Sequence, residues 1–467
     1  MWNRSEQTIC AISTPQGVGG LAVIRISGVE ALSVCKRISK SLNKKKVIES
    51  HRAYFSEIFS LSENSSENAF VNKIDEAVIT YFAKGKSFTG EETVEISCHG
   101  SKFIVQQILE LLISCGCRMA ERGEFTYRAF MNGRLDLVQA ESVLALIESQ
   151  NQASAIVALR QLEGHVSKQF AELISDLTWC LAHIEASIDF SEQGITVVDT
   201  GVLVKKLESI AEALKTLTHS YQSGKLIKDG IKVALIGEPN VGKSSLLNLL
   251  LQSDKAIVTP IAGTTRDAIE GDTLYDGVKY SISDTAGLRD TDDPVEIIGI
   301  NKSKTEASAA DVLCFILDCS QKDWSQSLRL AQEQKNLRKI FLLNKADITT
   351  EEHRAELLGR LGQNNAAIFT SALKPDSRAD IFAAIKATVG SLEYLNEALI
   401  SSARQYEQAA YSFEMISNCI HELKQNTGAE FVAMYLKESL LSLQKILGQV
   451  YDDQIMDRVF KEFCLGK

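Results

Sequence analysis

A chain of 467 residues is long enough for about three domains, each able to bury a core of its own. Hydrophobic residues make up 45% and charged residues 24%, which is ordinary for globular protein and excludes a disordered or collagen-like polypeptide. The formal net charge of −10 argues against indiscriminate binding of nucleic acid through its phosphates, while a local basic patch stays open.

The first 133 residues predict an α+β domain. The segments TICAIS and LAVIRIS alternate in hydrophobicity on either side of the loop TPQGVGG, which is typical of two paired strands around a Gly-rich turn. We expect further strands at 52–58, 77–82 and 92–98, and helices at 29–38 and 102–112. Strands with helices between them indicate an α+β fold that ends at about Gly133.

From Leu135 onward the apolar residues follow a helical period. One long stripe is formed by Leu159, Leu162, Val166, Phe170, Leu173, Leu177, Leu181, Ile184 and Ile188. Another helix is expected at 202–217, followed by a connection at 223–230. A second stripe, which needs a partner, is formed by Leu436, Leu440, Leu443, Leu447 and Val450. The first stripe is the simplest partner, so the intervening residues should form an inserted domain. The predicted boundaries are 1–133, 134–224 for the first half of the helical domain, 225–390 for the inserted domain, and 391–467.

The inserted domain begins with the apolar run IKVALIG, which ends abruptly in a glycine-rich loop. Gly237, Gly242, Lys243 and Ser244 fill the pattern G-x-x-x-x-G-K-[ST] between a predicted strand at 232–236 and a predicted helix at 244–251. Backbone N–H groups of such a loop cradle phosphate oxygens at the positive end of the helix dipole. We expect Lys243 to reach the β- and γ-phosphates and the Ser244 hydroxyl to coordinate Mg²⁺. An ordinary Gly-rich turn is the alternative.

Three later tetrapeptides follow in the order that an α/β P-loop GTPase domain of Ras-like type requires. DTAG at 284–287 places Asp284 to hold Mg²⁺ through water and the Gly287 N–H to face the γ-phosphate. NKAD at 344–347 offers the Asp347 carboxylate to the two N–H groups of guanine, which adenine lacks, and so favours GTP over ATP. TSAL at 370–373 can present a backbone N–H to guanine O6. Each tetrapeptide alone is weak evidence; four motifs in this order are strong.

The segment IAGTTRD at 261–267 should cover the nucleotide, and a Thr there completes Mg²⁺ coordination while the γ-phosphate is present. Thr265 is the expected ligand. Leu288 follows DTAG, where many small GTPases carry a water-orienting Gln, so this domain must orient its water differently. Arg266 and Arg289 are candidates for an arginine finger, and surface ion pairs are the alternative for both.

The motifs GEPNVGKSS, AGTTRD, DTAGLR and NKAD, with the terminal FCLGK, resemble the MnmE (TrmE) family of tRNA modification GTPases. TPQGVGGLAVIRISG, SFTGEETVEISCHG and RGEFTYRAFMNGRLDL extend the resemblance through the N-terminal region. The family implies a homodimer of a folate-binding and dimerisation domain, an all-α helical domain and an inserted GTPase domain. It also implies a complex of heterotetramer type with the flavoprotein MnmG (GidA), which carries FAD, and C5 modification of the wobble uridine of certain tRNAs.

The resemblance assigns the side chain of Asn240 to a K⁺ ion beside the phosphates, with oxygens of Thr259, Ile261 and Thr264 completing the cage. Such a cation does the work of an arginine finger. Glu296 matches the family's water-orienting carboxylate, and solvated helix surface is its alternative. The implied GTP-binding set comprises Asn240, Val241, Gly242, Lys243, Ser244, Ser245, Thr259, Pro260, Ile261, Ala262, Gly263, Thr264, Thr265, Asp284, Thr285, Ala286, Gly287, Asn344, Lys345, Ala346, Asp347, Ser371, Ala372 and Leu373.

The family's folate site implies Arg25, Glu95, Arg134 and the terminal Lys467, with 5-formyl- or methylene-tetrahydrofolate as the one-carbon donor. A carboxylate such as Glu95 can accept paired N–H bonds from a pterin ring, and Arg and Lys suit folate carboxylates. A buried ion pair between Glu95 and one of the arginines is the alternative.

Cys464 is a functional thiol in the resemblance and a small buried hydrophobe in the alternative, while the terminal CLGK does not fit lipidation. Ten scattered cysteines without a signal peptide or paired zinc spacing indicate reduced thiols in the cytoplasm. No apolar run is long enough to span a bilayer, so we expect no membrane partner.

The sequence therefore predicts a K⁺-assisted, Mg²⁺-dependent GTPase that drives tRNA modification. A ribosome-assembly GTPase would share the nucleotide motifs, but it would need a basic RNA-binding module that this sequence does not display. A folate-dependent one-carbon transferase with a purely regulatory GTPase domain is the second alternative.

Overall fold

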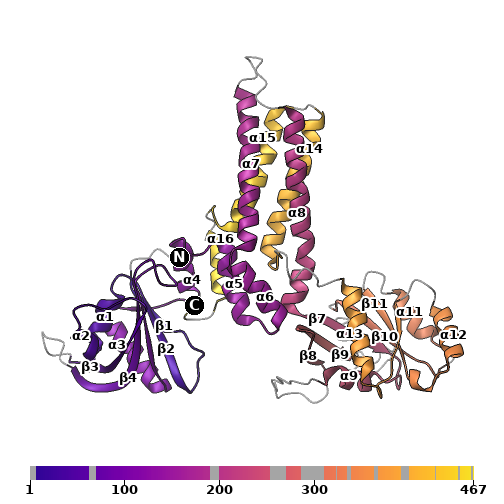
Figure 1. The fold of residues 1–467 in the computed structure, drawn as a ribbon, viewed down its shortest axis with the longest axis horizontal. Helices are drawn as coiled ribbons and strands as arrows, with labels where there is room; N and C mark the ends of the chain where they lie inside the picture. The colour runs from indigo at the N-terminus through magenta and orange to yellow at the C-terminus, as the bar shows by residue number, and fades with distance from the viewer. Residues whose placement is uncertain are drawn as a thin grey trace, which may run out of the picture. The chain divides into compact units, whose positions relative to one another are not determined.

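The computed structural model describes residues 7–62, 70–189, 199–252, 270–284, 310–321, 323–333, 338–361, 366–390, 399–425, 428–450, 453–463 and 466. The chain forms two compact units (Figure 1). The first unit comprises Met1–Leu144, Leu162–Thr200 and His421–Lys467, and the second comprises Ala145–Gln161 and Gly201–Ile420. Among the described residues, no helix has both the length and the apolar character needed to cross a bilayer.

The N-terminal part of the first unit is a six-stranded sheet in the order β3-β4-β5-β2-β1-β6. The strands are β1 (Ile9–Ile12), β2 (Gly19–Ser27), β3 (Arg52–Leu61), β4 (Phe70–Phe82), β5 (Thr93–Gly100) and β6 (Arg118–Met119). All pairings are antiparallel except β1 with β6. The strands alternate buried and exposed residues, and the buried ones pack with helices α1 (Ala31–Ile38) and α3 (Lys102–Ser114). The predicted α+β fold is confirmed.

Helices follow the sheet, beginning earlier than Leu135. They are α4 (Glu124–Met131), α5 (Leu137–Glu148), α6 (Gln152–Leu162), α7 (His165–Asp189) and α8 (Thr200–Asp229), and near the end of the chain α14 (Ala403–Gln425), α15 (Ala429–Leu447) and α16 (Asp453–Lys461). Helix α15 packs along α7, as the matching apolar stripes predicted (Figure 1). Lys437 on α15 also forms an ion pair with Glu185 on α7, with 2.9 Å between the charged atoms.

Two helix predictions were wrong. Gly164 has φ +87°, a left-handed conformation that separates α6 from α7, so the first stripe is not one continuous helix face. Leu159 on this stripe is 46% exposed. The expected connection at 223–230 is mostly helix, because α8 continues to Asp229 and its residue Ile227 is buried in the core of the second unit.

The second unit contains a six-stranded sheet in the order β12-β11-β10-β7-β9-β8. Its strands are β7 (Ile231–Gly237), β8 (Glu270–Tyr275), β9 (Val278–Asp284), β10 (Val312–Asp318), β11 (Arg338–Asn344) and β12 (Ala367–Phe369). All pairs are parallel except β8 with β9. Helices α9 (Lys243–Leu251) and α13 (Asp376–Val389) pack into one hydrophobic core, and α11 (Ser325–Glu333) and α12 (Glu351–Leu361) into another. The sheet thus has the covered, buried strands of an α/β domain, which confirms the predicted fold class.

Three of these strands end in predicted site residues, β7 in Gly237, β9 in Asp284 and β11 in Asn344, and β10 between them in the sheet ends in Asp318. The strands run parallel, so their carboxyl ends meet at one edge of the sheet, where ligands of such folds bind. The fold therefore brings distant motifs of the sequence to a common place.

Candidate functional site

The loop between β7 and α9 has the backbone of a phosphate cradle. Asn240 and Gly242 take left-handed conformations, with φ 65° and 99°. A Cβ atom on Gly242 would lie 2.3 Å from the Asn344 side-chain nitrogen, so only glycine fits there. Lys243 begins α9, and its Nζ donates to the carbonyls of Gly237 and Glu238, at 2.9 Å each. The loop therefore curls around the ammonium group that is expected to meet the phosphates.

Asp284 and Ser244 meet beside this lysine. The Ser244 hydroxyl donates to Asp284 Oδ2 at 3.3 Å, and Asp284 Oδ1 is buried without a hydrogen-bond partner. Burial raises the pKa of Asp284, against the opposing effects of Lys243 and Ser244. Burial also lowers the pKa of Lys243, which the Asp284 carboxylate partly counteracts. An unpartnered carboxylate oxygen beside a hydroxyl fits Mg²⁺, which usually takes one or two protein oxygens together with substrate phosphates.

Asn344 and Lys345 fix the phosphate loop to the guanine-recognition motif. Asn344 Nδ2 donates to the Val241 carbonyl at 2.8 Å, and its Oδ1 is buried without a partner. Lys345 Nζ donates to the Asn240 carbonyl at 3.1 Å and pairs with Asp318 Oδ2 at 2.6 Å. Sequence reasoning missed Asp318, although an acidic residue directly after the apolar strand VLCFIL was a signal of the same kind as NKAD.

The TSAL segment lies beside NKAD, as the motif order required. The Ala346 N–H donates to the Thr370 carbonyl at 3.0 Å. Asp347 is exposed, and a hydrogen bond from the Ser371 side chain is the main cause that lowers its pKa. Asp347 therefore stays ionised at neutral pH, which is the form that accepts two N–H groups of guanine. Ser371 itself is only 2% exposed, so its hydroxyl is held in place for this contact.

Several predicted residues lie outside the described part of the chain, and their roles stay predictions. They are Thr259, Pro260, Ile261, Ala262, Gly263, Thr264, Thr265, Arg266, Thr285, Ala286, Gly287, Leu288, Arg289, Glu296, Cys464 and Lys467. Of the predicted K⁺ ligands, only Asn240 is described. Its side chain is exposed and enters none of the described hydrogen bonds, so its amide oxygen fits a cation ligand.

A second group of predicted residues lies in the N-terminal sheet. Arg25 on β2 pairs with Glu95 on β5 through two nitrogens, Nε and Nη2, each 2.9 Å from Oε1. The guanidinium carbon also lies 5.5 Å from the ring centre of Phe88 and 5.7 Å from that of Phe125. The ion pair between Glu95 and an arginine, which was the alternative to a folate site, is therefore formed. The Glu95 side chain is 27% exposed, so a ligand can still reach it. Arg134 is exposed, and no described contact joins it to this pair.

The C-terminal tail returns to the same sheet. The Ser13 hydroxyl, directly after β1, donates to the Gly466 carbonyl at 3.2 Å. A Cβ atom on Gly466 would lie 2.0 Å from the Ile12 carbonyl oxygen, so the tail packs closely against the end of β1. The Ser13 N–H in turn donates to the carbonyl of Val23, two residues before Arg25. The tail thus contacts the end of β1, the strand that pairs with the strand that carries Arg25.

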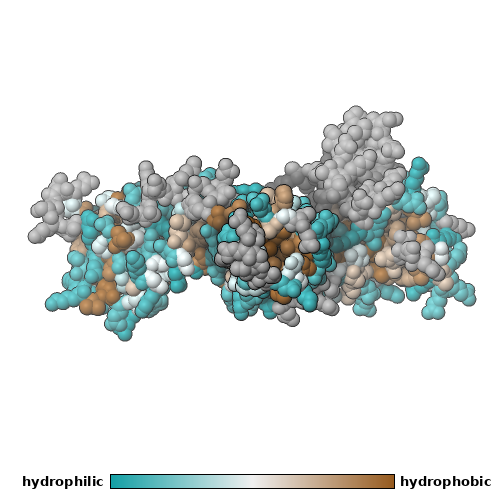
Figure 2. All heavy atoms as spheres, turned by 90° about the horizontal axis from the view of Figure 1, so that it is seen from above, coloured by the Kyte–Doolittle hydropathy of each residue, from teal (hydrophilic) through white to brown (hydrophobic). Residues whose placement is uncertain are grey.

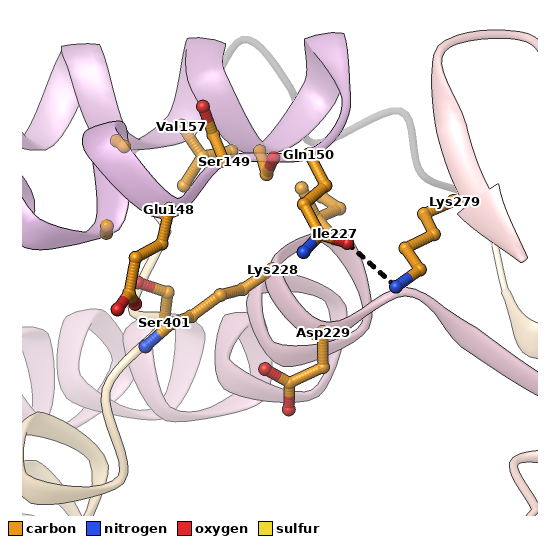
Figure 3. A pocket seen from close by; sticks show the side chains of 12 residues that line it. Glu148, Ser149, Gln150, Val157, Ile227, Lys228, Asp229, Lys279 and Ser401 are labelled. Atoms are coloured by element: carbon orange, nitrogen blue, oxygen red, sulfur yellow. Dashed lines mark hydrogen bonds between the residues drawn. The ribbon is translucent and has the colours of Figure 1, made fainter. Parts of the chain in front are cut away.

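The second unit also holds a cavity of about 410 Å³ (Figure 3). It is lined by the end of α5, by α6, by the end of α8 and by Lys279 on β9. Lys279 Nζ donates to Gln150 Oε1 at 2.8 Å, shown as a dashed line in Figure 3. Among the described residues, none of those predicted for nucleotide or folate binding lines this cavity.

Comparisons with known proteins cover the whole chain. The family model described as GTP-binding protein TrmE N-terminus matches residues 8–134, and the model of the MnmE helical domain matches residues 137–464. A protein of Bdellovibrio bacteriovorus named tRNA modification GTPase MnmE is 46% identical over 481 residues, covering 100% of this chain and 98% of the relative. The protein of the same name from Clostridioides difficile is 37% identical over 464 residues, covering 99% of each chain.

Among solved structures, the G domain of the FeoB iron transporter of T. maritima is 27% identical, covering 34% of this chain and 99% of its own. Its TM-score is 0.28, so the family assignment rests on the full-length relatives.

Proposed function

Because the chain belongs to the tRNA modification GTPase MnmE family, we propose that it hydrolyses GTP in the cytoplasm to drive C5 modification of the wobble uridine of certain tRNAs. The modification is of aminomethyl or carboxymethylaminomethyl type. The observation that carries the proposal is the meeting of the phosphate loop, Asp284 and NKAD at one sheet edge, in a chain whose full-length relatives are named tRNA modification GTPase.

In hydrolysis, the residues of this sheet edge hold GTP and set its charge environment. Lys243 lies where it can neutralise the β- and γ-phosphates, while Ser244 would coordinate Mg²⁺ and Asp284 would hold it through water. When bound, Mg²⁺ stabilises the negative charge that develops on the phosphates. Asp347 selects guanine by accepting its two N–H groups. Asn344 links the phosphate-binding end of the site to its base-binding end. Its amide fixes the phosphate loop at Val241, and the residues that follow Asn344 recognise the base.

For the attack by water, the proposal uses Glu296 to orient the nucleophile and Asn240 as a ligand of K⁺. When bound, K⁺ supplies positive charge that small GTPases obtain from an arginine finger. The exposed amide of Asn240, on a left-handed turn of the phosphate loop, supports this role. Thr259, Ile261 and Thr264 are the other proposed ligands, and Thr265 would join Mg²⁺ when the γ-phosphate is present.

For the one-carbon unit, we propose that Arg25, Glu95, Arg134 and Lys467 bind 5-formyl- or methylene-tetrahydrofolate. Glu95 has two carboxylate oxygens, of which Arg25 uses Oε1, so Oε2 is available to a pterin N–H. The position of Gly466 against Ile12 and Ser13 supports a contribution from the tail, including the proposed thiol Cys464.

The proposed partners are a second copy of the chain, tRNA and the flavoprotein MnmG, which carries the FAD. Exposed hydrophobic residues interrupt the hydrophilic surface shown in Figure 2. On the N-terminal sheet, Phe55 and Val78 are paired neighbours that are 63% and 42% exposed, and Leu21 on β2 is 71% exposed. Such a partly uncovered apolar face supports a homodimer formed through this domain.

The test is a strain that lacks the gene, with wobble uridines measured by mass spectrometry of hydrolysed tRNA. We expect the modified uridine to disappear, to return with the wild-type gene, and to stay absent with Asp284→Ala. Persistence of the modification in the deletion strain, with a defect in ribosomal subunits, would favour the ribosome-assembly alternative. Normal modification with Asp284→Ala would favour the transferase whose GTPase domain is only regulatory.

A further inference from the structure

A network of four charges is centred on two buried residues of helix α4. Glu124 and Arg128 occupy successive turns of α4, and their side chains are each 4% exposed. Arg128 Nη2 donates to Glu124 Oε1 and to the Gln7 carbonyl, at 2.9 Å each, while Nη1 donates to Oε1 and Oε2 of Glu91 at 3.2 and 3.0 Å. Arg118 donates to both oxygens of Glu124, at 3.1 and 2.5 Å. Two positive and two negative charges are thus paired, which offsets the cost of removing them from water.

The network ties the loop between β4 and β5 to α4. Glu91 belongs to that loop, so the two hydrogen bonds that Arg128 Nη1 donates to its carboxylate are the first attachment. Asn132, which directly follows α4, makes the second attachment by donating from Nδ2 to the Thr89 carbonyl at 2.8 Å. Phe88 directly precedes Thr89 in the sequence, so this part of the loop cannot shift away from α4 without breaking the hydrogen bonds at Thr89 and Glu91.

Two aromatic rings held by these elements contact the guanidinium of Arg25. Phe125 comes from α4 itself and is fully buried, and Phe88 comes from the tied loop. Both rings that contact the Arg25 guanidinium thus come from elements that the hydrogen bonds of Arg128 and Asn132 join to each other. We propose that Arg128 is a positioning residue: it holds the loop so that Phe88 and Phe125 aim Arg25 at a folate bound beside Glu95. This inference rests on the proposed folate site.

Arginine is required for this role because its planar fork can hold Glu91, Glu124 and a carbonyl at once. Lysine keeps the charge but presents it as a single point without the paired geometry. A residue needed only to fill the core would be replaceable by an apolar side chain of similar volume, because buried ion pairs are often no more stabilising than such a replacement. A positioning role for Arg128 and a role in filling the core therefore predict different effects of replacing this residue.

The test compares Arg128→Lys and Arg128→Met with the wild-type full-length chain, using calorimetric titration with 5-formyl-tetrahydrofolate well below the melting temperature of each variant. We expect the dissociation constant to rise about tenfold in Arg128→Lys, as for one misaligned charge-assisted hydrogen bond, and further in Arg128→Met. Asn132→Ala, an exposed change that removes only the second attachment, should raise it in the same direction. Arg52→Lys is the matched control, since Arg52 forms an exposed ion pair with Glu49, and its dissociation constant should equal that of the wild type.

A role in stability alone lowers the melting temperature and leaves folate affinity unchanged in the folded protein. That outcome in both Arg128→Lys and Asn132→Ala would overturn the inference while leaving the folate site standing. If the wild-type chain does not bind the folate, the proposed folate site itself is wrong, and the positioning role fails with it. Should Arg128→Met not fold, Asn132→Ala and Arg128→Lys still decide the question.

Discussion

Replacing Gly242 by alanine tests the phosphate loop at its most constrained position. The glycine has φ +99°, and a Cβ atom there would lie 2.3 Å from Asn344 Nδ2. That nitrogen donates to the Val241 carbonyl at 2.8 Å, so the alanine must either distort the loop or push the Asn344 amide away. The change thus acts on the loop and on the base-recognition motif together.

The magnitude follows from two costs. A non-glycine residue in the left-handed region costs roughly 1–2 kcal/mol. Losing the Asn344 to Val241 hydrogen bond costs a further 0.5–1.5 kcal/mol or so. A loss of roughly 1.5–3.5 kcal/mol in the binding-competent loop should raise the GTP dissociation constant about 10- to 300-fold.

The assay is a titration with a fluorescent GTP analogue, with thermal unfolding followed in parallel. Gly359→Ala is the matched control, because Gly359 lies within helix α12 and an added Cβ meets nothing within 4 Å. It should leave GTP affinity unchanged and stabilise the helix by up to about 1 kcal/mol. Wild-type GTP affinity in Gly242→Ala would refute the placement of this loop at the phosphates.

Four further outcomes are expected. Asp347→Asn should shift preference from guanine to xanthine nucleotides, since the amide donates where xanthine offers a carbonyl; unchanged GTP affinity contradicts the base assignment. Replacing K⁺ by Na⁺, or Asn240→Ala, should slow hydrolysis by up to about 10³- to 10⁵-fold with nucleotide binding retained, and equal rates in both salts exclude the cation role. Since burial raises the pKa of Asp284, affinity for Mg²⁺ should fall on acidification at a higher pH than an exposed aspartate would give. A pH titration should show that Asp284→Asn abolishes this dependence. Removing 464–467 should reduce folate binding and tRNA modification while sparing GTP binding and K⁺-stimulated hydrolysis; full modification in cells contradicts a role for the tail.

The nucleotide-binding edge could be predicted because its signals are local. The apolar run before Gly237 and the glycines after it fix a strand, a loop and a helix within about twenty residues. NKAD likewise follows directly on its strand, so the parallel sheet brings Asn344 to the loop without further information. The order of the motifs in the sequence and the order of the parallel strands were together enough to predict that the phosphate loop and NKAD meet.

A helix was expected at 202–217, but the last turns of α8 could not be predicted, because they depend on distant residues. Gly224 interrupts the helical pattern, yet a Cβ atom there would lie 2.2 Å from the Ile400 carbonyl oxygen. The glycine therefore permits close packing against a segment more than 170 residues later in the sequence. Leu226 and Ile227 are then buried with the second sheet, and this packing sustains the helix through a stretch that alone looks like a linker.

The charged network of α4 was hidden for a related reason. In the sequence RGEFTYRAF, Glu124 and Arg128 look like the solvated face of a helix. Their burial becomes favourable only because Glu91 and Arg118, from other parts of the N-terminal domain, complete the ion pairs. Sequence patterns report the burial of apolar residues well, but a buried charge is recognised only when its partners are known.

The topology of the first unit gives the C-terminal tail a structural role besides its proposed part in folate binding. Ser13 and Gly466 are 453 positions apart, and α7 packs on α15, so the first unit is complete only when the end of the chain is in place. Every strand of the second sheet, in contrast, comes from residues 231–369. A change in the tail therefore acts first on the packing of β1 and on the strand that bears Arg25.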